Sequence, residues 1–305
     1  EGLRVTSRNS TMRFRGSENP LPEIAREIGV EALVEGSVLR AGDRIEVTLQ
    51  LIRGRTDDHL WAEHYERETR HVFNLSVDAA NAIGAVLGLR PVAAPMGSIE
   101  PRALQAYWKG LYHWDQLTGP GIRQAIDEFR TATEIEPGFG LAWGALSASY
   151  AVYARRGHAP QLEYIEKSRA AALKAIESGN GAWIGYAGLG WSRLWTRDLR
   201  GACEAFREAL RINPSAPYAI HGDAECMMFA GRIDEHVERI RELAMLEAQA
   251  LNHNRPLSFH LFYARRYDEA LAATLDMQKR FPGVPMHVIL SIIYWAQGEY
   301  EKALE

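Results

Sequence analysis

Two hydrophobic periods divide the chain near residue 100. Before that point, apolar and polar residues alternate in several short runs, which is typical of strands with one buried face. These runs predict a strand at 3–8, a hairpin across 32–54 with its turn at 41–43, and a strand or an extended arm at 59–68. The first part of the chain is therefore expected to contain a small sheet.

Two stretches of the same part have helical spacing, 22–29 and 72–89. Pro22 suits the first turn of the earlier helix, and Gly29 suits its end. Strands and helices in this order predict a small α/β layer, with helices packed on a sheet of mixed direction.

A linker is predicted where three prolines and a glycine fall within 90–101. Strand-like alternation stops there, and helical spacing continues to the end of the chain. We expect an α/β domain at 1–92, a linker at 93–101 and an all-α domain at 102–305.

The all-α part repeats itself. The run AIDEFRTATEIEP at 125–137 returns with the same offsets as ACEAFREALRINP at 202–214, and related Asp-Glu or Glu-Lys entries follow downstream. His236 precedes Ala270 by 34 residues, and Ala270 precedes Ala303 by 33. A helical period near 34 residues is the sequence sign of a solenoid built from helix-turn-helix units.

Small residues recur at fixed places in these runs, and packing explains them. Antiparallel helices approach to about 8–10 Å only when the side chains between them are small. One unit cannot bury its own apolar face, so the units must stack. We expect four alanines to be contact points and two rings to fill the adjacent gaps: Ala125, Ala132, Ala202 and Ala209, with Phe129 and Phe206.

The first helix of each unit carries a second recurring pattern. Trp143 is followed by Leu146 and Tyr150, and Trp183 is followed by Tyr186 one unit later. Together with the Ala-Phe-Ala-Pro helices, this pattern resembles the tetratricopeptide repeat (TPR). The resemblance implies a right-handed superhelix of about five complete repeats and a truncated sixth. The unit containing 237–243 departs from the pattern, because it lacks the aromatic residue and the second alanine.

The first domain resembles another family through four words: LRVTSRNST, IAREIGVEALVEGSV, RIEVTLQLI and HLWAEHYER. They are similar to a domain family that is named for its resemblance to the TolB amino-terminal region and is also grouped with FlgO-like domains. The first strand and helix of that family would lie upstream of this chain. That resemblance implies a bacterial signalling protein, such as a winged-helix transcription regulator, a class III adenylate cyclase or a protein kinase. The chain begins at Glu1 and ends along a predicted helix, so we expect a fragment of a longer protein.

Composition narrows the class of protein further. Hydrophobic residues make up 47% and charged residues 24%, as in soluble globular proteins, and the net charge of −4 argues against a nucleic-acid surface. The two cysteines lack metal-ligand spacing, so we predict neither a disulfide framework nor a structural zinc site. Reduced cysteines and no signal peptide predict a cytoplasmic location, with an extracytoplasmic one as the alternative if a membrane span lies upstream.

No catalytic motif stands out. The glycine-rich run 179–190 lacks the Lys-Ser/Thr of a phosphate loop and is interpreted as close packing around Trp183. His59 and His64 have the wrong spacing for two metal ligands on one face of a helix or strand. We therefore predict no catalytic residue, no metal and no cofactor.

Partner binding is the predicted activity, because the first helices of stacked pairs line the concave surface. The repeat offsets place twelve residues there: Tyr107, Leu111, Trp114, Trp191, Tyr218, His221, Glu225, Met228, Asn252, Arg255, Phe259 and Phe262. Aromatic anchors with few charges suit a protein or peptide ligand, and an apolar helix or extended segment fits better than a carboxylate. The alternative is that several of these residues pack against long helices or the first domain.

Two functions are weighed. The first is a non-catalytic regulatory module that binds a protein or peptide partner, or itself, in the concave groove. The second is an α/β domain that senses a small molecule, with the repeats as a spacer or dimerisation element. An uncapped apolar face near Ile289, Ile292 and Ile293 favours self-association into a homo-oligomer.

Overall fold

The computed structural model describes residues 5–6, 11, 14, 16–89, 97–116, 118–246, 251–281 and 285–304, without the side chains of 246 and 251–256. Its residues group into two compact units, 16–192 and 193–305, the second together with 1–15. The strand predicted at 3–8 falls mostly outside the described residues.

The first unit begins with the predicted short helix. Helix α2 (Leu21–Ile28) has Pro22 in its first turn and buries Ile24 and Ala25. It ends at Gly29, whose φ of 70° lies in the left-handed region that glycine enters without steric cost. The predicted helix at 22–29 is confirmed.

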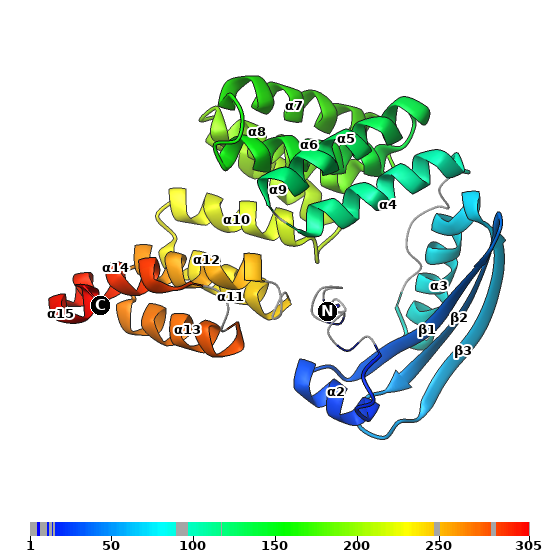
Figure 1. The fold of residues 1–305 in the computed structure, drawn as a ribbon, viewed down its shortest axis with the longest axis horizontal. Helices are drawn as coiled ribbons and strands as arrows, with labels where there is room; N and C mark the ends of the chain where they lie inside the picture. The colour runs from blue at the N-terminus through cyan, green and yellow to red at the C-terminus, as the bar shows by residue number, and fades with distance from the viewer. Residues whose placement is uncertain are drawn as a thin grey trace. The chain divides into compact units, whose positions relative to one another are not determined.

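A three-stranded sheet follows, with strand order β1-β2-β3 (Figure 1). The strands are β1 (Ala32–Ala41), β2 (Arg44–Arg53) and β3 (His59–Glu68). Both pairings are antiparallel, so the predicted hairpin is confirmed and 59–68 is a strand rather than an arm. Among the described strands the sheet is antiparallel rather than mixed, because the short links at 42–43 and 54–58 leave no room for the crossover that parallel strands need.

One helix covers this sheet. The 3-10 turn η1 (Thr69–His71) leads into α3 (Val72–Val86), which packs on β2 and β3. Alternation along the strands turns Ile45, Val47 and Tyr65 toward α3, where they meet Leu75 and Ala79 in a buried core. Described residues of β1 are mostly exposed, including Val34, Val38 and Leu39. The result is the expected small α/β layer.

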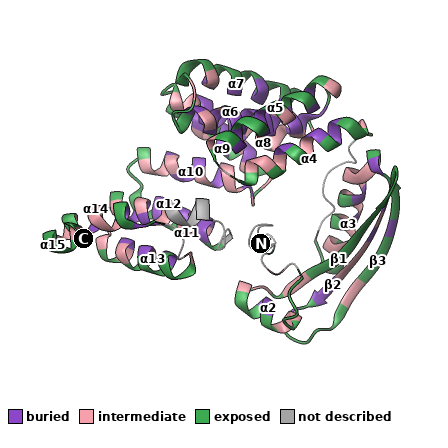
Figure 2. Cartoon of the chain, viewed as in Figure 1, coloured by how far each residue is buried: buried purple, intermediate pink, exposed green. Residues whose placement is uncertain are grey.

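The helical array begins within the same unit. Its helices there are α4 (Pro101–Asp115), α5 (Gly119–Ile135), α6 (Gly140–Arg155), α7 (Gln161–Glu177) and α8 (Ala182–Trp195), along which the chain passes into the second unit. Side chains cap two of the starts: Glu100 accepts hydrogen bonds from the N–H groups of Arg102 and Ala103, and Thr118 accepts one from Gly121. Buried residues are concentrated along α5 and α6 (Figure 2).

An aromatic cluster joins the α/β layer to the first helix pair. Phe73 of α3 lies 6.3 Å from the Tyr107 ring of α4 and 5.7 Å from the Phe139 ring, centroid to centroid. Ile99 is buried beside them and its N–H donates to the carbonyl oxygen of Arg70. These contacts lie close to the predicted linker, whose boundaries at 93–101 stay a prediction.

The second unit continues the array. Its helices are α9 (Leu199–Ile212), α10 (Pro217–Phe229), α11 (Ile233–Leu246), α12 (Leu251–Tyr263), α13 (Tyr267–Arg280), α14 (His287–Gln297) and α15 (Tyr300–Leu304). Successive helices pack against one another, with a core between α12, α13 and α14 that includes Leu261, Met277 and Ile293. No helix among the described residues is both long and apolar enough to cross a membrane.

The recurring small residues are buried as predicted. The four alanines at 125, 132, 202 and 209 are 0% exposed, and Phe129 and Phe206 are at most 1% exposed. Phe129 projects from α5 toward α4, where a Cβ added to Gly110 would lie 2.5 Å from the ring. Close approach of paired helices therefore accounts for the small residues in both units.

The cysteines correct one prediction. Cys203 of α9 and Cys226 of α10 form a disulfide with a Cα–Cα distance of 5.8 Å, within the usual range for such bonds. They are 23 residues apart, and the antiparallel packing of the two helices brings them together. The expectation of reduced cysteines is therefore wrong. The cysteines no longer support the prediction of a cytoplasmic location.

Candidate functional site

The predicted groove residues of the first unit lie largely in its core. Tyr107 packs on Phe129 and Phe139, and burial raises the pKa of its hydroxyl to about 12. Leu111 and Trp114 are partly buried against the core that contains Phe129. Trp191 is buried, with 7% of its surface exposed. These placements agree with the alternative that some aromatic residues serve packing.

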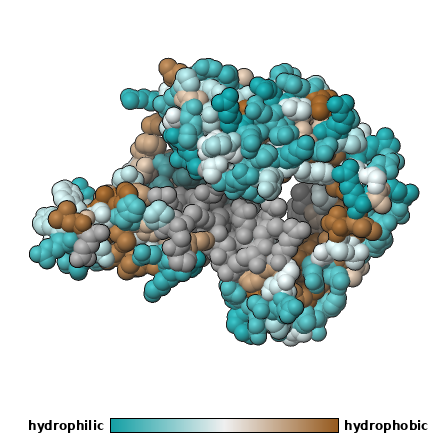
Figure 3. Space-filling model, in the orientation of Figure 1, coloured by the Kyte–Doolittle hydropathy of each residue, from teal (hydrophilic) through white to brown (hydrophobic). Residues whose placement is uncertain are grey.

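The remaining predicted residues belong to the second unit. Six are partly buried along two helices: Tyr218, His221, Glu225 and Met228 on α10, and Phe259 and Phe262 on α12. The side chains of Asn252 and Arg255 lie outside the described residues. Figure 3 shows hydrophobic residues on the surface over α12 to α14, whereas hydrophilic residues cover most of the surface over α5 and α7. Partner binding by the predicted set stays a prediction.

Two of these residues join a polar cluster. His221 and Glu225 are four residues apart on α10, so they share one face of the helix. The Nε2 atom of His221 lies 3.7 Å from Glu225 Oε1, and the Nε2 atom of His260 on α12 lies 3.8 Å from the same oxygen. The rings of His221 and His260 meet edge to face at 5.6 Å. The cluster therefore links the first helices of two successive pairs.

A third histidine supports the cluster from behind. His236 of α11 is 1% exposed, with its Nδ1 atom 2.7 Å from the carbonyl oxygen of Ala224 and its Nε2 atom 2.9 Å from His260 Nδ1. A carbonyl oxygen only accepts hydrogen bonds, so Nδ1 of His236 is the donor to Ala224. Where Nε2 of His236 accepts, the hydrogen between the two rings belongs to Nδ1 of His260.

Burial and charge set the ionisation of this cluster. Burial lowers the pKa of His260 to about 4 despite the opposing pull of the Glu225 carboxylate, so the ring is neutral at pH 7. Burial also opposes ionisation of Glu225, but the hydrogen bond with His221 and the nearby histidines outweigh it and hold the pKa of Glu225 below its usual range. Asp223, on the same helix, is paired with Arg239 of α11 at 3.4 Å.

The sequence contained only part of the signal for this cluster. The i,i+4 spacing of His221 and Glu225 is visible in it, and both were predicted on the groove face. His236 takes the place that Ala202 holds one period earlier (236 − 34 = 202) and Ala270 one period later. Both alanines are fully buried close-approach positions. A histidine there departs from the repeat, but only the packing shows that it reaches His260.

The folds of solved proteins match the helical array. The chain is similar to one in the crystal structure of the APC/C hetero-tetramer Cut9-Hcn1, at 14% identity over 66% of this chain and 38% of that one, with a TM-score of 0.50. It is also similar to a thermophilic TPR protein of Thermus thermophilus, at 15% identity over 66% of this chain and 98% of that one, again with a TM-score of 0.50. At these identities the likeness shows the fold alone: a small α/β domain precedes a TPR-like helical array.

No protein-family model matches the chain. Among curated proteins, it is similar to "Putative adenylate cyclase 3" of Rhizobium meliloti (strain 1021), at 26% identity over 205 residues. The match covers 65% of this chain and 35% of that protein, so the chain spans about a third of the relative's length.

Proposed function

We propose that this chain is a non-catalytic, protein-binding module of a larger bacterial signalling protein. The helical array, taken as residues 102–305, binds a protein or peptide segment, and the α/β domain at 1–92 connects that event to an output domain. The observation that carries the proposal is the fold. A TPR-like array presents the first helix of each pair to a ligand, and such surfaces recognise peptides through a few apolar anchors.

The second unit supplies the residues of the proposed binding face. On α10, Tyr218 and Met228 lie at the two ends of the helix and are each partly accessible. On α12, the first helix of the next pair along the chain, the rings of Phe259 and Phe262 are partly buried. A partner that covers the exposed part of these side chains removes apolar area from water, which favours binding in proportion to that area.

The similarity to a protein named as an adenylate cyclase supports the signalling context. The match leaves most of that protein's length outside this chain, which fits a regulatory module attached to a separate output domain. Cyclase output, like the resemblance of residues 1–92 to TolB-like domains, belongs to this proposal.

The binding face is tested with peptides selected from a random display library against the full chain. Replacing Tyr218 and Met228 together with alanine is expected to weaken the selected peptides at least tenfold, because both side chains lose the apolar area that a ligand would cover. Fluorescence polarisation with labelled peptides measures the dissociation constants, and far-UV circular dichroism checks the fold of the variant.

The matched control is Leu275→Ala, which removes a side chain of 39% exposure from the second helix of a pair, α13. It should leave the peptide affinity unchanged. An equal loss of peptide affinity in the control and the double variant would contradict the proposed face. So would peptides that bind the double variant as tightly as the wild type.

A further inference from the structure

We propose that His221, Glu225 and His260 form a binding site for a divalent transition-metal ion, with Zn²⁺ as the ion that fits best. Each residue offers one ligand atom, and these atoms all lie within 4.8 Å of one another. Two ligands come from α10 and one from α12, so a bound ion would join the first helices of two successive pairs within the second unit. This site goes beyond peptide binding and does not depend on it.

A second histidine orients His260. When Nε2 of His236 accepts, the Nδ1–H of His260 donates to it, while Nδ1 of His236 donates to the carbonyl oxygen of Ala224. In a neutral His260 ring, the lone pair is then on Nε2, the atom that faces Glu225 at 3.8 Å. A cation held between these two electron-rich atoms would remove the repulsion between them. A histidine ligand that donates its other ring N–H to a fixed acceptor is the usual arrangement around protein-bound metals.

The distances between the ligand atoms also suit zinc. Zinc binds imidazole nitrogen and carboxylate oxygen at about 2.0–2.2 Å, which places neighbouring tetrahedral ligand atoms about 3.3–3.6 Å apart. The two distances to Glu225 Oε1 are 3.7 and 3.8 Å, so shifts of about half an ångström bring these atoms to ligand spacing. Side-chain rotation about χ angles supplies movements of this size without moving the helices.

The kind of ligand selects the kind of ion. Two imidazoles and one carboxylate suit zinc and related transition metals, whereas Mg²⁺ and Ca²⁺ prefer sets made of oxygen atoms alone. Asp223 is committed to Arg239, which leaves Glu225 as the carboxylate of the cluster. Three protein ligands leave a fourth position for water or for a donor atom of a partner.

The three ligand side chains are accessible to an ion, and a buried histidine supports them. The side chains of His221, Glu225 and His260 are 22%, 15% and 10% exposed, so an ion reaches the cluster while most of it is shielded from water. His236 is buried where neighbouring repeats keep alanine, and packing alone gives no reason for an imidazole there. Orienting His260 is a reason, which makes His236 a positioning residue.

The test uses the full 305-residue chain, stripped of metal with EDTA, dialysed and titrated with Zn²⁺ by isothermal calorimetry. We expect one saturable site and a rise in melting temperature with Zn²⁺ but not with Mg²⁺. Glu225→Gln and His221→Gln should each weaken Zn²⁺ binding at least tenfold and remove the rise. His236→Ala should weaken binding by about 10- to 100-fold through loss of the oriented His260 ring.

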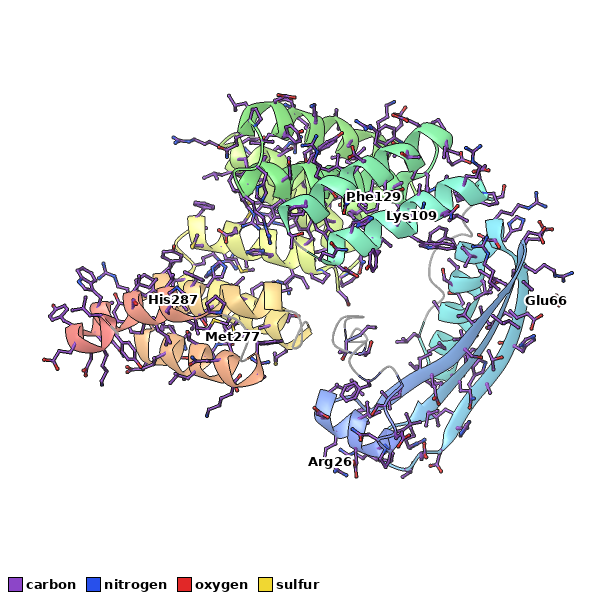
Figure 4. All side chains as sticks on the ribbon, in the orientation of Figure 1. Arg26, Glu66, Lys109, Phe129, Met277 and His287 are labelled. Carbon is purple, nitrogen blue, oxygen red and sulfur yellow. A yellow bond between two sulfur atoms is a disulfide. The ribbon has the colours of Figure 1, made fainter. Side chains whose placement is uncertain are left out.

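The matched control is His287→Gln, at an exposed histidine of α14 in the same unit (Figure 4). It should bind Zn²⁺ like the wild type. Glu225→Gln preserves the shape of the side chain, and His221→Gln changes the most exposed of the three ligands. We therefore expect both variants to fold, and circular dichroism checks this. Absence of saturable binding, or an equal loss in His287→Gln and the ligand variants, would overturn the site.

Discussion

Replacing Phe129 with alanine is expected to lower the free energy of unfolding of the first unit by about 3–5 kcal/mol. The ring is 1% exposed and lies between α5 and α4, with the Tyr107 ring centroid 5.7 Å away. Removing it leaves a cavity that the close-packed alanines around it are too short to fill. Urea unfolding measures the loss, and amide exchange in α4 and α5 locates it, because repeat arrays need not unfold in one step.

Gly110 makes this prediction specific. An alanine there would ordinarily stabilise a helix by about 1 kcal/mol. Here its Cβ would lie 2.5 Å from a ring atom of Phe129, and overpacking of this kind costs about 1–3 kcal/mol. Gly110→Ala should therefore destabilise the wild type but stabilise the Phe129→Ala variant, which is a reversal of sign in a double-mutant cycle.

Tyr112→Ala provides the control on the same helix, because this side chain is 68% exposed and its loss should change stability by less than about 0.5 kcal/mol. A stabilising Gly110→Ala in the wild type, or a Phe129→Ala loss no larger than that of Tyr112→Ala, would show that the two helices do not meet as described.

Reducing the bond between Cys203 and Cys226 is expected to destabilise the second unit by about 3 kcal/mol, because a cross-link over this span restricts the unfolded chain. Cys203 is partly exposed, so a phosphine reductant reaches the bond. Urea unfolding with and without reductant measures the difference. The double variant Cys203→Ala and Cys226→Ala should resemble the reduced wild type and show no response to reductant.

The state of the sulfurs is checked directly by alkylating the unfolded chain before and after reduction and weighing it by mass spectrometry. Both thiols should become reactive only after reduction. Two alkylated cysteines in unreduced protein, or identical unfolding curves with and without reductant, would contradict the bond.

The sequence predicted local structure correctly where the spacing of apolar residues reflects the buried face of a single helix or strand. Alternation at 32–54 identified the β1–β2 hairpin, and Gly29 marked the end of α2. Along the array, the alanines at offsets shared by 125–137 and 202–214 are buried contact points. In each case the spacing of apolar residues along the chain indicates which face of the helix or strand is buried. This prediction does not require knowing which distant residues pack against that face.

The surroundings of the candidate site residues depend on distant neighbours. Tyr107, predicted to line the groove, packs between Phe73 of the α/β layer and Phe139, and its part in binding stays a prediction. Its position on the helix was predictable, but the element facing it was not. The same holds for His236, whose departure from the repeat is plain in the sequence, while its ring partner is 24 residues away.

Periodicity along the chain was enough to predict the order of an α/β layer and a helical array, the repeat length and the residues that allow close helix packing. Three features depended on the folded chain: the antiparallel pairing of the described strands, the bond between the two cysteines, and the convergence of His221, Glu225 and His260. The physical reason is that periodicity encodes burial one element at a time. Contacts across 23 or 35 residues, as from Cys203 to Cys226 and from Glu225 to His260, are set by how the helices stack.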